Sequence, residues 1–273
     1  MEDLAGAAAP NCFAPGLLEG QVAFVTGGAT GIGKEICRVL GRAGARVVMA
    51  SRKQENLEAA AGELRAEGID ATFGVFDVRH PDAVRSVLEA AVSGQGRLDI
   101  VVNDAAGNFP APMSAISPNG FKAIVDIDLL GTYNVSRTAF DLWLRDHGGS
   151  IVNISAPFEF RGVTYQAHVA AAKAGVDSLT RTCAVEWGPY GIRVNAIAPG
   201  SIQATEGLRR FAEAVPDASP RPTNPLGMHG HGTDIANLAL FLCSPAARFI
   251  SGQVIAVDGA GSTDMLRLGA GRI

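Results

Sequence analysis

The stretch of sequence that decides the fold is 22–33, which reads VAFVTGGATGIG. It opens with a short apolar run, continues into a cluster of glycines, and leads directly into Ile36, Val39 and Leu40. These three residues have the i, i+3, i+4 spacing of the apolar face of a helix. A short apolar strand, a glycine turn and an amphipathic helix are the usual start of a βαβ unit.

The same alternation of short β-branched runs and helical stretches continues along the chain. We expect strands at 22–25, 46–50, 71–76, 98–102, 151–154, 194–198 and 254–257, and helices near 36–43, 57–64, 81–94, 118–145, 165–187, 203–214 and 233–244. Continuously apolar strands between helices are typical of a parallel sheet that is covered on both faces. The prediction is therefore a single, doubly wound α/β domain with a mostly parallel, seven-stranded sheet.

The domain boundaries follow from composition, since no repeat or composition break marks a second domain. We expect 1–19 to be a flexible N-terminal extension and 20–273 to be the folded domain. The segment 199–232 is rich in Pro, Gly and His. Long irregular segments inside compact α/β domains are often lids or binding loops, so we expect a C-terminal substrate lid there.

Composition excludes several classes of protein. The 273 residues are 47% hydrophobic and 18% charged, which is enough for a packed core. A net charge of −4 argues against a nucleic-acid partner. The four cysteines are far apart, so no metal site is expected, and no apolar run approaches the ~18 residues of a membrane span. We expect a cytoplasmic protein, or a peroxisomal one in a eukaryote, although the C-terminal tripeptide 271–273 matches a peroxisomal signal poorly.

The glycine turn is a candidate phosphate site. Its glycines permit a tight turn and let backbone N–H groups approach a pyrophosphate, while the helix N-terminus adds positive potential. The alternative is a purely structural turn. The candidate cofactor-binding residues here are Thr26, Gly27, Gly28, Thr30, Gly31, Ile32 and Gly33.

The end of the second strand predicts which dinucleotide binds. A carboxylate there would accept the ribose 2′-OH of NAD, but the chain has Ser51 and Arg52 instead. Arg52 can pair with a 2′-phosphate and Ser51 can donate a hydrogen bond, so we expect NADP(H). The alternative is a solvated Arg52–Lys53 pair at a helix start. Asp77 and Val78 are expected at the adenine edge, unless Asp77 is a helix cap.

Five motifs in order resemble the short-chain dehydrogenase/reductase family. They are TGGATGIG at 26–33, NDAAG at 103–107, Lys173 in an Ala-rich helix, NAIAPG at 195–200 and VDG at 257–259. The resemblance covers about 20–262 and implies a Rossmann-like domain, a nicotinamide cofactor and a homotetramer or homodimer. It also implies cofactor contacts from Asn103, Ala105, Lys173, Pro199, Gly200 and Ile202.

The chain departs from the usual carbonyl-reducing members of that family at the catalytic positions. Those members have Tyr four residues before the helix lysine and Ser thirteen residues before that Tyr. Here the two positions are Val169 and Ala156, which have no hydroxyl to polarise a carbonyl or donate a proton. A position usually filled by Asn is Asp128. Ordinary alcohol or ketone chemistry is therefore disfavoured.

A narrower branch of the family has this pattern. The segments AAGNF at 105–109, DID at 126–128, EWGP at 186–189 and TEGLRR at 205–210 resemble peroxisomal-type 2,4-dienoyl-CoA reductases. The resemblance implies NADPH-dependent reduction of an acyl-CoA thioester, from 2,4-dienoyl-CoA to 3-enoyl-CoA, within β-oxidation of unsaturated fatty acids.

The resemblance also implies the catalytic roles. Hydride addition to the far end of the diene leaves negative charge on the thioester oxygen, and Asn108 would donate an N–H to it. The alternative is a structural loop asparagine. The dienolate then needs a proton at Cα, and Asp128 lies beside Lys173 in the family register. A carboxyl next to a cation is expected to have a lowered pKa, so a water between Asp128 and Lys173 is the expected donor. The alternative for Asp128 is a structural carboxylate bonded to backbone.

Four further residues are candidate substrate contacts. Phe109 and Phe158 would line the acyl channel, His168 would contact substrate or shuttle a proton, and Arg209 would meet CoA phosphates. The alternatives are core aromatics, a structural histidine and a solvated helix face. Two rival functions stay open: a related reductase acting on another acyl thioester or a carrier-bound substrate, and a catalytically silent cofactor-binding homologue. Retention of Lys173 and Asp128 argues against the silent homologue.

Overall fold

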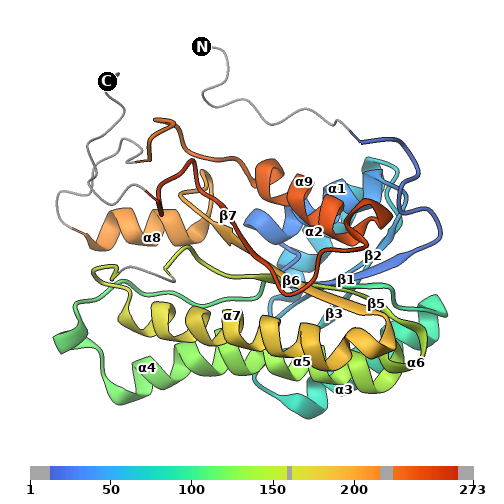
Figure 1. Ribbon diagram of the computed structural model, residues 1–273, viewed down its shortest axis with the longest axis horizontal. Coiled ribbons are helices and arrows are strands. Elements are labelled where there is room, and N and C mark those ends of the chain that lie inside the picture. Colours follow the sequence, from blue (N-terminus) through green and yellow to red (C-terminus); the bar gives the residue numbers. More distant parts are fainter. Residues whose placement is uncertain (1–12, 159–161, 216–223, 264–273) are drawn as a thin grey trace.

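The computed structural model describes residues 13–158, 162–215 and 224–263 and contains one seven-stranded sheet, ordered β3-β2-β1-β4-β5-β6-β7 (Figure 1). The strands are β1 (Val22–Thr26), β2 (Arg46–Ser51), β3 (Ala71–Val75), β4 (Ile100–Asn103), β5 (Gly149–Ile154), β6 (Ile192–Pro199) and β7 (Val254–Val257). Every pairing between these strands is parallel. The predicted doubly wound, Rossmann-like fold is confirmed, and its sheet is parallel throughout.

Helices cover both faces of the sheet (Figure 1). One face carries α1 (Gly31–Arg42), α2 (Gln54–Ala66) and α9 (Gly232–Cys243); the other carries α3 (Pro81–Gln95), α4 (Pro118–Ile124), α5 (Gly131–Ala139), α6 (Arg145–His147) and α7 (Ala167–Trp187). Helix α8 (Glu206–Ala214) lies apart from both groups, beyond the end of the sheet. Short 3-10 turns occupy Met113–Ala115, Gly188–Tyr190 and Pro245–Ala247.

The first strand explains why these strands are continuously apolar. Successive side chains of a strand point to opposite faces. Val22 and Phe24 enter the core beneath α3, α5 and α7, whereas Ala23 and Val25 enter the core beneath α1, α2 and α9. All five residues of β1 are buried, so the strand has no solvent-exposed face that would require alternating polar residues.

The predicted long helix 118–145 is one continuous helical run, but it is not regular. Two π-helical segments, Val125–Leu130 and Phe140–Leu144, separate α4, α5 and α6. The helix predicted at 165–187 begins only at Ala167, because Tyr165 has a φ of 65° and cannot continue a right-handed helix. Likewise, the helix predicted from 203 begins at Glu206, after the capping residue Thr205.

The packed part of the chain begins earlier than predicted. Leu18 is fully buried in the core beneath α1, and Phe13 and Leu17 pack against the same cluster. Residues 1–12 and the C-terminal tripeptide 271–273 lie outside the described residues. The segment 199–232, predicted to be a lid, contains α8 and a bridge between Ile202 and Gly230, with 216–223 outside the described part.

The topology creates a crevice at the carboxyl end of the sheet. Strand β1 has β2 on one side and β4 on the other, so the direction of winding reverses between β1 and β4. Thr26 and Asn103 pair at the ends of these two strands. Ligands of open α/β sheets bind at this switch point, which is where the motif residues gather.

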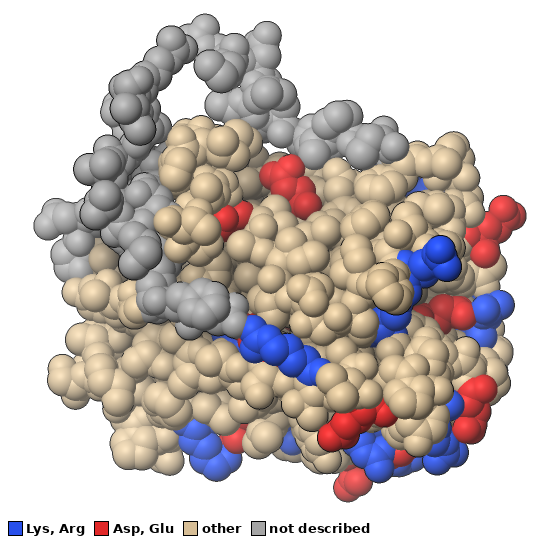
Figure 2. All heavy atoms as spheres, in the orientation of Figure 1, with Lys and Arg blue, Asp and Glu red and all other residues tan. Residues whose placement is uncertain are grey.

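The surface shows no single-sign field on the face drawn in Figure 2, where basic and acidic side chains lie next to one another. Over the described residues, no helix is both long and apolar enough to cross a membrane.

Candidate active site

The glycine turn at 26–33 closes tightly against the loop that follows β4. The hydroxyl of Thr26 accepts hydrogen bonds from the N–H groups of Asp104 and Ala105, each at 3.1 Å. Gly27 has a φ of 71°, and a Cβ there would lie 2.9 Å from a carboxylate oxygen of Asp104. A Cβ on Gly33 would lie 2.5 Å from the Gly27 carbonyl oxygen. Both positions require glycine.

The other side of this turn is open. Gly31 has a φ of 54°, and a Cβ there would meet only the methyl group of Thr205, at 3.9 Å. Within the described residues, the Thr30 side chain makes no capping hydrogen bond with α1. The turn is therefore open around Gly31, at the start of α1, which fits a bound pyrophosphate.

The remaining turn residues belong to the packing around α1. A Cβ on Gly28 would lie 3.0 Å from Sγ of Cys37, so the turn rests directly on this buried thiol. Ile32 packs against the core beneath α1 and α9. Gly28 and Ile32 therefore pack the turn against the core and do not line its open side.

At the end of β2, Ser51 is half-buried and Arg52 is exposed. The Arg79 guanidinium lies 2.6 Å from the Asp77 carboxylate. The hydrogen bonds and the charge of Arg79 lower the pKa of Asp77, and Arg52 makes a smaller contribution. The cap of α3 is His80, not Asp77. Val78 is buried, and its carbonyl accepts a hydrogen bond from Asn134.

Asn103 is a structural tie between strands. Its Nδ2 donates to Ser136 Oγ at 2.9 Å and to Asn153 Oδ1 at 2.8 Å, joining β4 to α5 and β5. After β6, the N–H of Gly200 donates to Val257 O at 2.9 Å, and Pro199 ends the strand. A Cβ on Gly200 would lie 2.7 Å from Asp258, so β6 and β7 approach closely here.

Asp128 and Lys173 meet beneath the loop 105–109. Asp128 lies in the first π-helical segment and is fully buried; its Oδ1 accepts a hydrogen bond from the Gly107 N–H at 2.7 Å. Its Oδ2 lies 3.6 Å from Nζ of Lys173. The same ammonium donates to Ile154 O at 2.7 Å. A π-helical insertion re-aims side chains and is frequent at functional sites.

The electrostatics of Asp128 differ from the sequence expectation. Burial raises the pKa of Asp128 above its usual value, and the opposing effects of the Lys173 charge and the Gly107 N–H are smaller. The predicted lowering of this pKa was wrong because it counted the cation and not the loss of water around the carboxyl. Asp128 therefore keeps a proton to higher pH than an exposed carboxyl does.

Of the two positions that usually carry hydroxyls, Ala156 is half-buried and Val169 lies in an apolar cluster. Val169 packs with Ile124 and Ala172 from α4 and α7, and Phe158 lies against the same cluster. Tyr165 precedes α7, where its carbonyl accepts a hydrogen bond from the Ala111 N–H. It lies in a turn outside the helix that carries Lys173.

His168, in the first turn of α7, contacts the loop that follows β4. It is buried, its Nε2 lies 3.0 Å from the carbonyl oxygen of Phe109, and the two rings are 4.3 Å apart. Burial lowers the pKa of His168 and favours the neutral ring. With Nε2–H donating to the carbonyl, Nδ1 is left as an acceptor rather than an acid.

Buried polar atoms without partners gather around this site. Among the described residues these include Asn108 Oδ1, Asp128 Oδ2, Gln166 Oε1 and His168 Nδ1. They come from the loop after β4, the π-helical segment and the start of α7. Because buried polar atoms are normally hydrogen-bonded, this group fits a site that is completed by substrate or water.

The two arginines of α8 have different partners. Arg209 forms ion pairs with Glu206 at 2.6 Å and Glu213 at 2.7 Å along the exposed side of α8. Arg210 also pairs with Glu206, at 2.8 Å, and in addition donates to the backbone carbonyl oxygen of Asn108, 2.8 Å away. Arg210 therefore joins α8 to the loop that carries Asn108. Arg209 does not make such a contact.

His229 and His231 both have partners within the fold. His231 caps α9 and forms a capping box with Asp234, and His229 Nδ1 lies 2.7 Å from Ser201 Oγ. Over the described residues, no group of three or more His, Cys, Asp or Glu side chains could hold a metal ion.

Comparison with known proteins agrees with this geometry. A family model described as enoyl-(acyl carrier protein) reductase matches residues 27–262. The chain is 47% identical over 253 residues to the peroxisomal 2,4-dienoyl-CoA reductase [(3E)-enoyl-CoA-producing] of Rattus norvegicus, covering 91% of this chain and 86% of the relative. It is 42% identical over 247 residues to the probable 2,4-dienoyl-CoA reductase [(2E)-enoyl-CoA-producing] of Bacillus subtilis, covering 89% of this chain and 96% of the relative.

Solved structures with the same fold are also similar. A citronellol catabolism dehydrogenase of Pseudomonas aeruginosa superimposes with a TM-score of 0.83 at 37% identity, covering 93% of this chain and 100% of that one. An actinorhodin polyketide ketoreductase with NADPH superimposes with a TM-score of 0.85 at 28% identity, covering 89% of this chain and 97% of that one.

Proposed function

This chain belongs to the short-chain dehydrogenase/reductase family, and on that basis we propose that it is an NADPH-dependent 2,4-dienoyl-CoA reductase. The family implies a nicotinamide cofactor. The observation that carries the narrower proposal is the buried Asp128–Lys173 pair, together with Ala156 and Val169 in place of the usual hydroxyl groups. This set of residues is suited to protonating a carbon, and lacks the groups that polarise a ketone.

The choice of NADPH rests on the end of β2. Ser51 and Arg52 present a hydroxyl and an exposed cation where a carboxylate would favour NAD. The open side of the glycine turn would hold the pyrophosphate, and Lys173 the nicotinamide ribose. Ala105, Pro199 and the other motif residues would border the cofactor through their backbone. Bound NADPH would supply a hydride to the far end of the conjugated diene.

Asn108 would stabilise the negative charge that then develops on the thioester oxygen. The neighbouring Gly107 bonds to Asp128, which holds the Asn108 loop against the buried pair, and Nδ2 of Asn108 is the group that would donate. The buried Oδ1 of Asn108 has no hydrogen-bond partner among the described residues and can only accept. Donors that are already oriented toward a developing oxyanion stabilise it without reorganisation. The contact from Arg210 to the Asn108 carbonyl would hold this loop in position.

The proton for Cα would come from Asp128. Its Oδ1 is occupied by the Gly107 N–H, so the proton would reside on Oδ2. Burial keeps this carboxyl protonated to higher pH, which is the form that a general acid needs. A water in contact with both Oδ2 and Lys173 Nζ is an equally compatible route. His168 is a poorer donor because its ring is held neutral.

Substrate contacts follow the same geometry. Phe109 and Phe158 would border the acyl chain, with His168 behind Phe109. Arg209 is already paired with carboxylates of its own helix, so any contact with CoA phosphates would have to displace them. We retain acyl-CoA as the substrate class, as the names of the relatives describe for those proteins.

Assembly and location are parts of the same proposal. We propose a homotetramer or homodimer, as is usual in the family. The rat relative's name places that protein in the peroxisome. For this chain we propose the cytoplasm, or the peroxisome if the source is a eukaryote. Size-exclusion chromatography with light scattering and imaging of the tagged chain would test these two points.

The experiment that tests the reaction identifies the product of 2,4-hexadienoyl-CoA reduction by NMR. Protonation at Cα leaves the double bond at carbon 3, and we expect this 3-enoyl product. A 2-enoyl product, the outcome in the printed name of the Bacillus subtilis relative, would mean that the proton reaches carbon 4 instead. That result would contradict the assigned placement of Asp128 against Cα.

A second candidate is reduction of the same type of thioester on a carrier protein. The printed description of the matching family model favours it. Comparing kcat/KM for one dienoyl group on CoA and on acyl carrier protein separates the two candidates. Lack of NADPH turnover with either would support the catalytically silent alternative.

A further inference from the structure

Asp104 is a titratable residue that the proposed reaction does not use. It follows Asn103 at the end of β4 and is half-buried, with its carboxyl group against the glycine turn. The N–H of Gly33 donates a hydrogen bond to this carboxyl. A Cβ on Gly27 or on Gly33 would lie 2.9 or 2.5 Å from its Oδ2. The carboxyl therefore packs against one side of the glycine turn, and the pyrophosphate would bind on the opposite, open side.

The surroundings of Asp104 supply little compensation for a negative charge. The charge of Lys173, on α7, favours the ionised form of Asp104. The same ammonium also lies 3.6 Å from Asp128 and donates a hydrogen bond to the Ile154 carbonyl. From α1, it faces the buried thiol of Cys37, whose pKa is raised far above its usual value, so that the thiol is neutral. Burial outweighs Lys173 and raises the pKa of Asp104 to about 8.

An anion in the glycine turn would add a second negative charge next to this carboxyl. The pyrophosphate would be held by N–H groups at the start of α1, and Asp104 already uses the N–H of Gly33 in the first turn of that helix. The pyrophosphate and the Asp104 carboxylate would repel each other in a partly desolvated site. Protonation of Asp104 removes this repulsion. The cofactor and the ionised carboxylate thus compete for the same positive potential.

We propose that Asp104 is a proton-binding group of the cofactor site, so that NADPH binds to the form with a protonated Asp104 carboxyl and draws a proton onto it. The inference rests on the proposed NADPH site. It predicts that NADPH affinity falls with rising pH above neutrality, where the 2′-phosphate of the cofactor is already fully ionised.

The test is direct titration of NADPH into the enzyme without acyl substrate, followed by the fluorescence of the cofactor. From about pH 7 to about pH 9.5 the Kd of the wild type should rise about tenfold, the effect of roughly one unit of linked pKa change. Asp104→Asn has no titrating carboxyl, so its Kd should stay flat. Asp82→Asn removes a similar charge from the exposed first turn of α3 and should behave like the wild type.

A second measurement needs no variant. Calorimetric titration with NADPH near pH 8 in two buffers of different ionisation enthalpy should show uptake of about half a proton per site. No proton uptake, or an unchanged pH dependence in Asp104→Asn, would overturn the role of Asp104 while leaving the reductase proposal intact. Failure to bind NADPH at any pH would contradict both.

Discussion

At the residue scale, burial raises the pKa of Asp128 and favours its protonated form. Removing the carboxyl as a proton source should lower kcat by ~10²–10⁴-fold in Asp128→Asn, which keeps the shape of the side chain. Lys173→Ala should be at least as severe, because it would also lose the contact to the ribose. Initial rates at saturating NADPH and dienoyl-CoA measure both effects.

The pH profile of kcat tests the same assignment. Because the proton must be present on Asp128, kcat should decline as pH rises through the raised pKa of this carboxyl, and Asp128→Asn should lose that limb. Saturating NADPH separates this effect from cofactor binding. Near-wild-type turnover by Asp128→Asn, with unchanged circular dichroism, would reject Asp128 as the acid.

Arg52 should determine cofactor preference. A charge-assisted contact to the 2′-phosphate contributes about 1.5–3 kcal/mol, so NADPH should bind about tenfold or more tightly than NADH. Arg52→Ala should remove most of this preference, whereas Lys53→Ala, an equally exposed neighbour, should retain it. Measured Kd values for both cofactors decide the point. A wild type that prefers NADH would refute the interpretation of this strand end.

Arg210 and Arg209 form a matched pair of lid variants. Losing the Arg210 contact should free the Asn108 loop and lower kcat/KM for dienoyl-CoA by about tenfold, the value of one charge-assisted hydrogen bond. Arg209→Ala should stay within about twofold, since this side chain pairs only along the exposed side of α8 in the described residues. Equal effects of the two substitutions would argue against the proposed positioning contact.

Local signals predicted part of this site, and burial explains what they missed. The glycines of the turn could be predicted because a positive φ and close backbone contacts leave few other residue types. The direction of the Asp128 pKa could not, because desolvation depends on segments far away in the sequence. Asp104 was visible in the NDAAG motif, but nothing in the motif says that its carboxyl lies beneath the turn.

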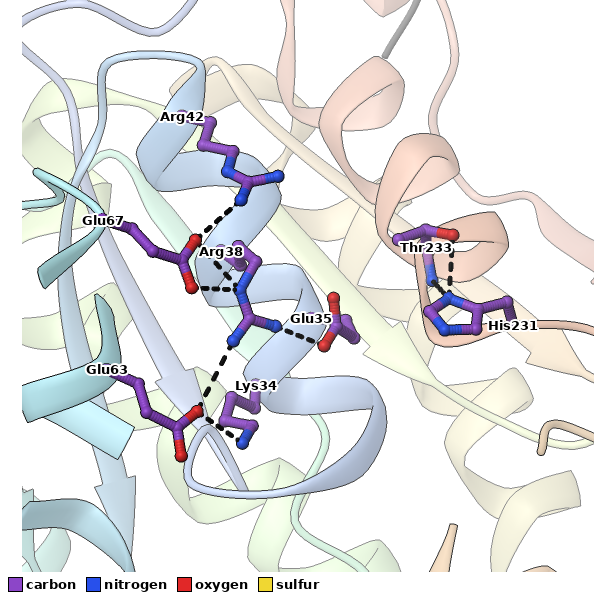
Figure 3. A network of polar contacts seen from close by, with 8 residues as sticks. All are labelled: Lys34, Glu35, Arg38, Arg42, Glu63, Glu67, His231 and Thr233. Atoms are coloured by element: carbon purple, nitrogen blue, oxygen red, sulfur yellow. Dashed lines mark hydrogen bonds and ion pairs between the residues drawn. The ribbon is translucent and has the colours of Figure 1, made fainter. Parts of the chain in front are cut away.

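At the scale of elements, charged side chains tie α1 to α2 (Figure 3). Arg38 is the centre of this network: it pairs with Glu35 on its own helix, with Glu67 at 2.8 Å and with Glu63 at 3.6 Å. Only 15% of its side chain is exposed. Lys34 and Arg42 add single pairs to the same two acidic residues of the α2 region.

Arg38→Ala should therefore lower the free energy of unfolding by about 1–2 kcal/mol at neutral pH. Arg42→Ala, which removes one largely exposed pair, should cost less than about 0.5 kcal/mol. Urea unfolding at fixed pH measures both. A larger loss in Arg42→Ala than in Arg38→Ala would contradict this description of the network.

The pH dependence of that loss has a definite sign. Partial burial opposes ionisation of Glu67, but Arg38 and Arg42 outweigh it and lower its pKa. A lowered folded-state pKa stabilises the fold above the ordinary Glu value of about 4.3, and this stabilisation is lost as pH falls through the folded-state value. The penalty of Arg38→Ala should accordingly shrink in acid.

Which segments form helices and which form strands could be predicted, but the irregular turns within and before the helices could not. The apolar spacing of 118–145 is compatible with one long helix, and the structure has one helical run there. The π-helical turn at Val125–Leu130 leaves no clear mark in a pattern with a period of 3.6, yet it carries Asp128. The start of α7 was misplaced because a positive φ at Tyr165 is not encoded by a glycine or asparagine.

At the scale of the whole molecule, strand order brings distant motifs together. Parallel strands and right-handed crossovers restrict the possible topologies, so the crevice between β1 and β4 could be predicted from alternation alone. The contact between Arg210 and Asn108 spans 102 positions of sequence and depends on where α8 packs. No local pattern specifies such a contact, so the sequence could not distinguish Arg210 from Arg209 in this respect.

The measurement that tests the central claim most directly compares two thioesters in one assay of NADPH consumption. The site has a carbon-protonating carboxyl and apolar residues at Ala156 and Val169, so kcat/KM for 2,4-hexadienoyl-CoA should exceed that for acetoacetyl-CoA by at least about a hundredfold, the usual value of a missing general acid. Efficient reduction of acetoacetyl-CoA without activity on the dienoyl thioester would contradict the account.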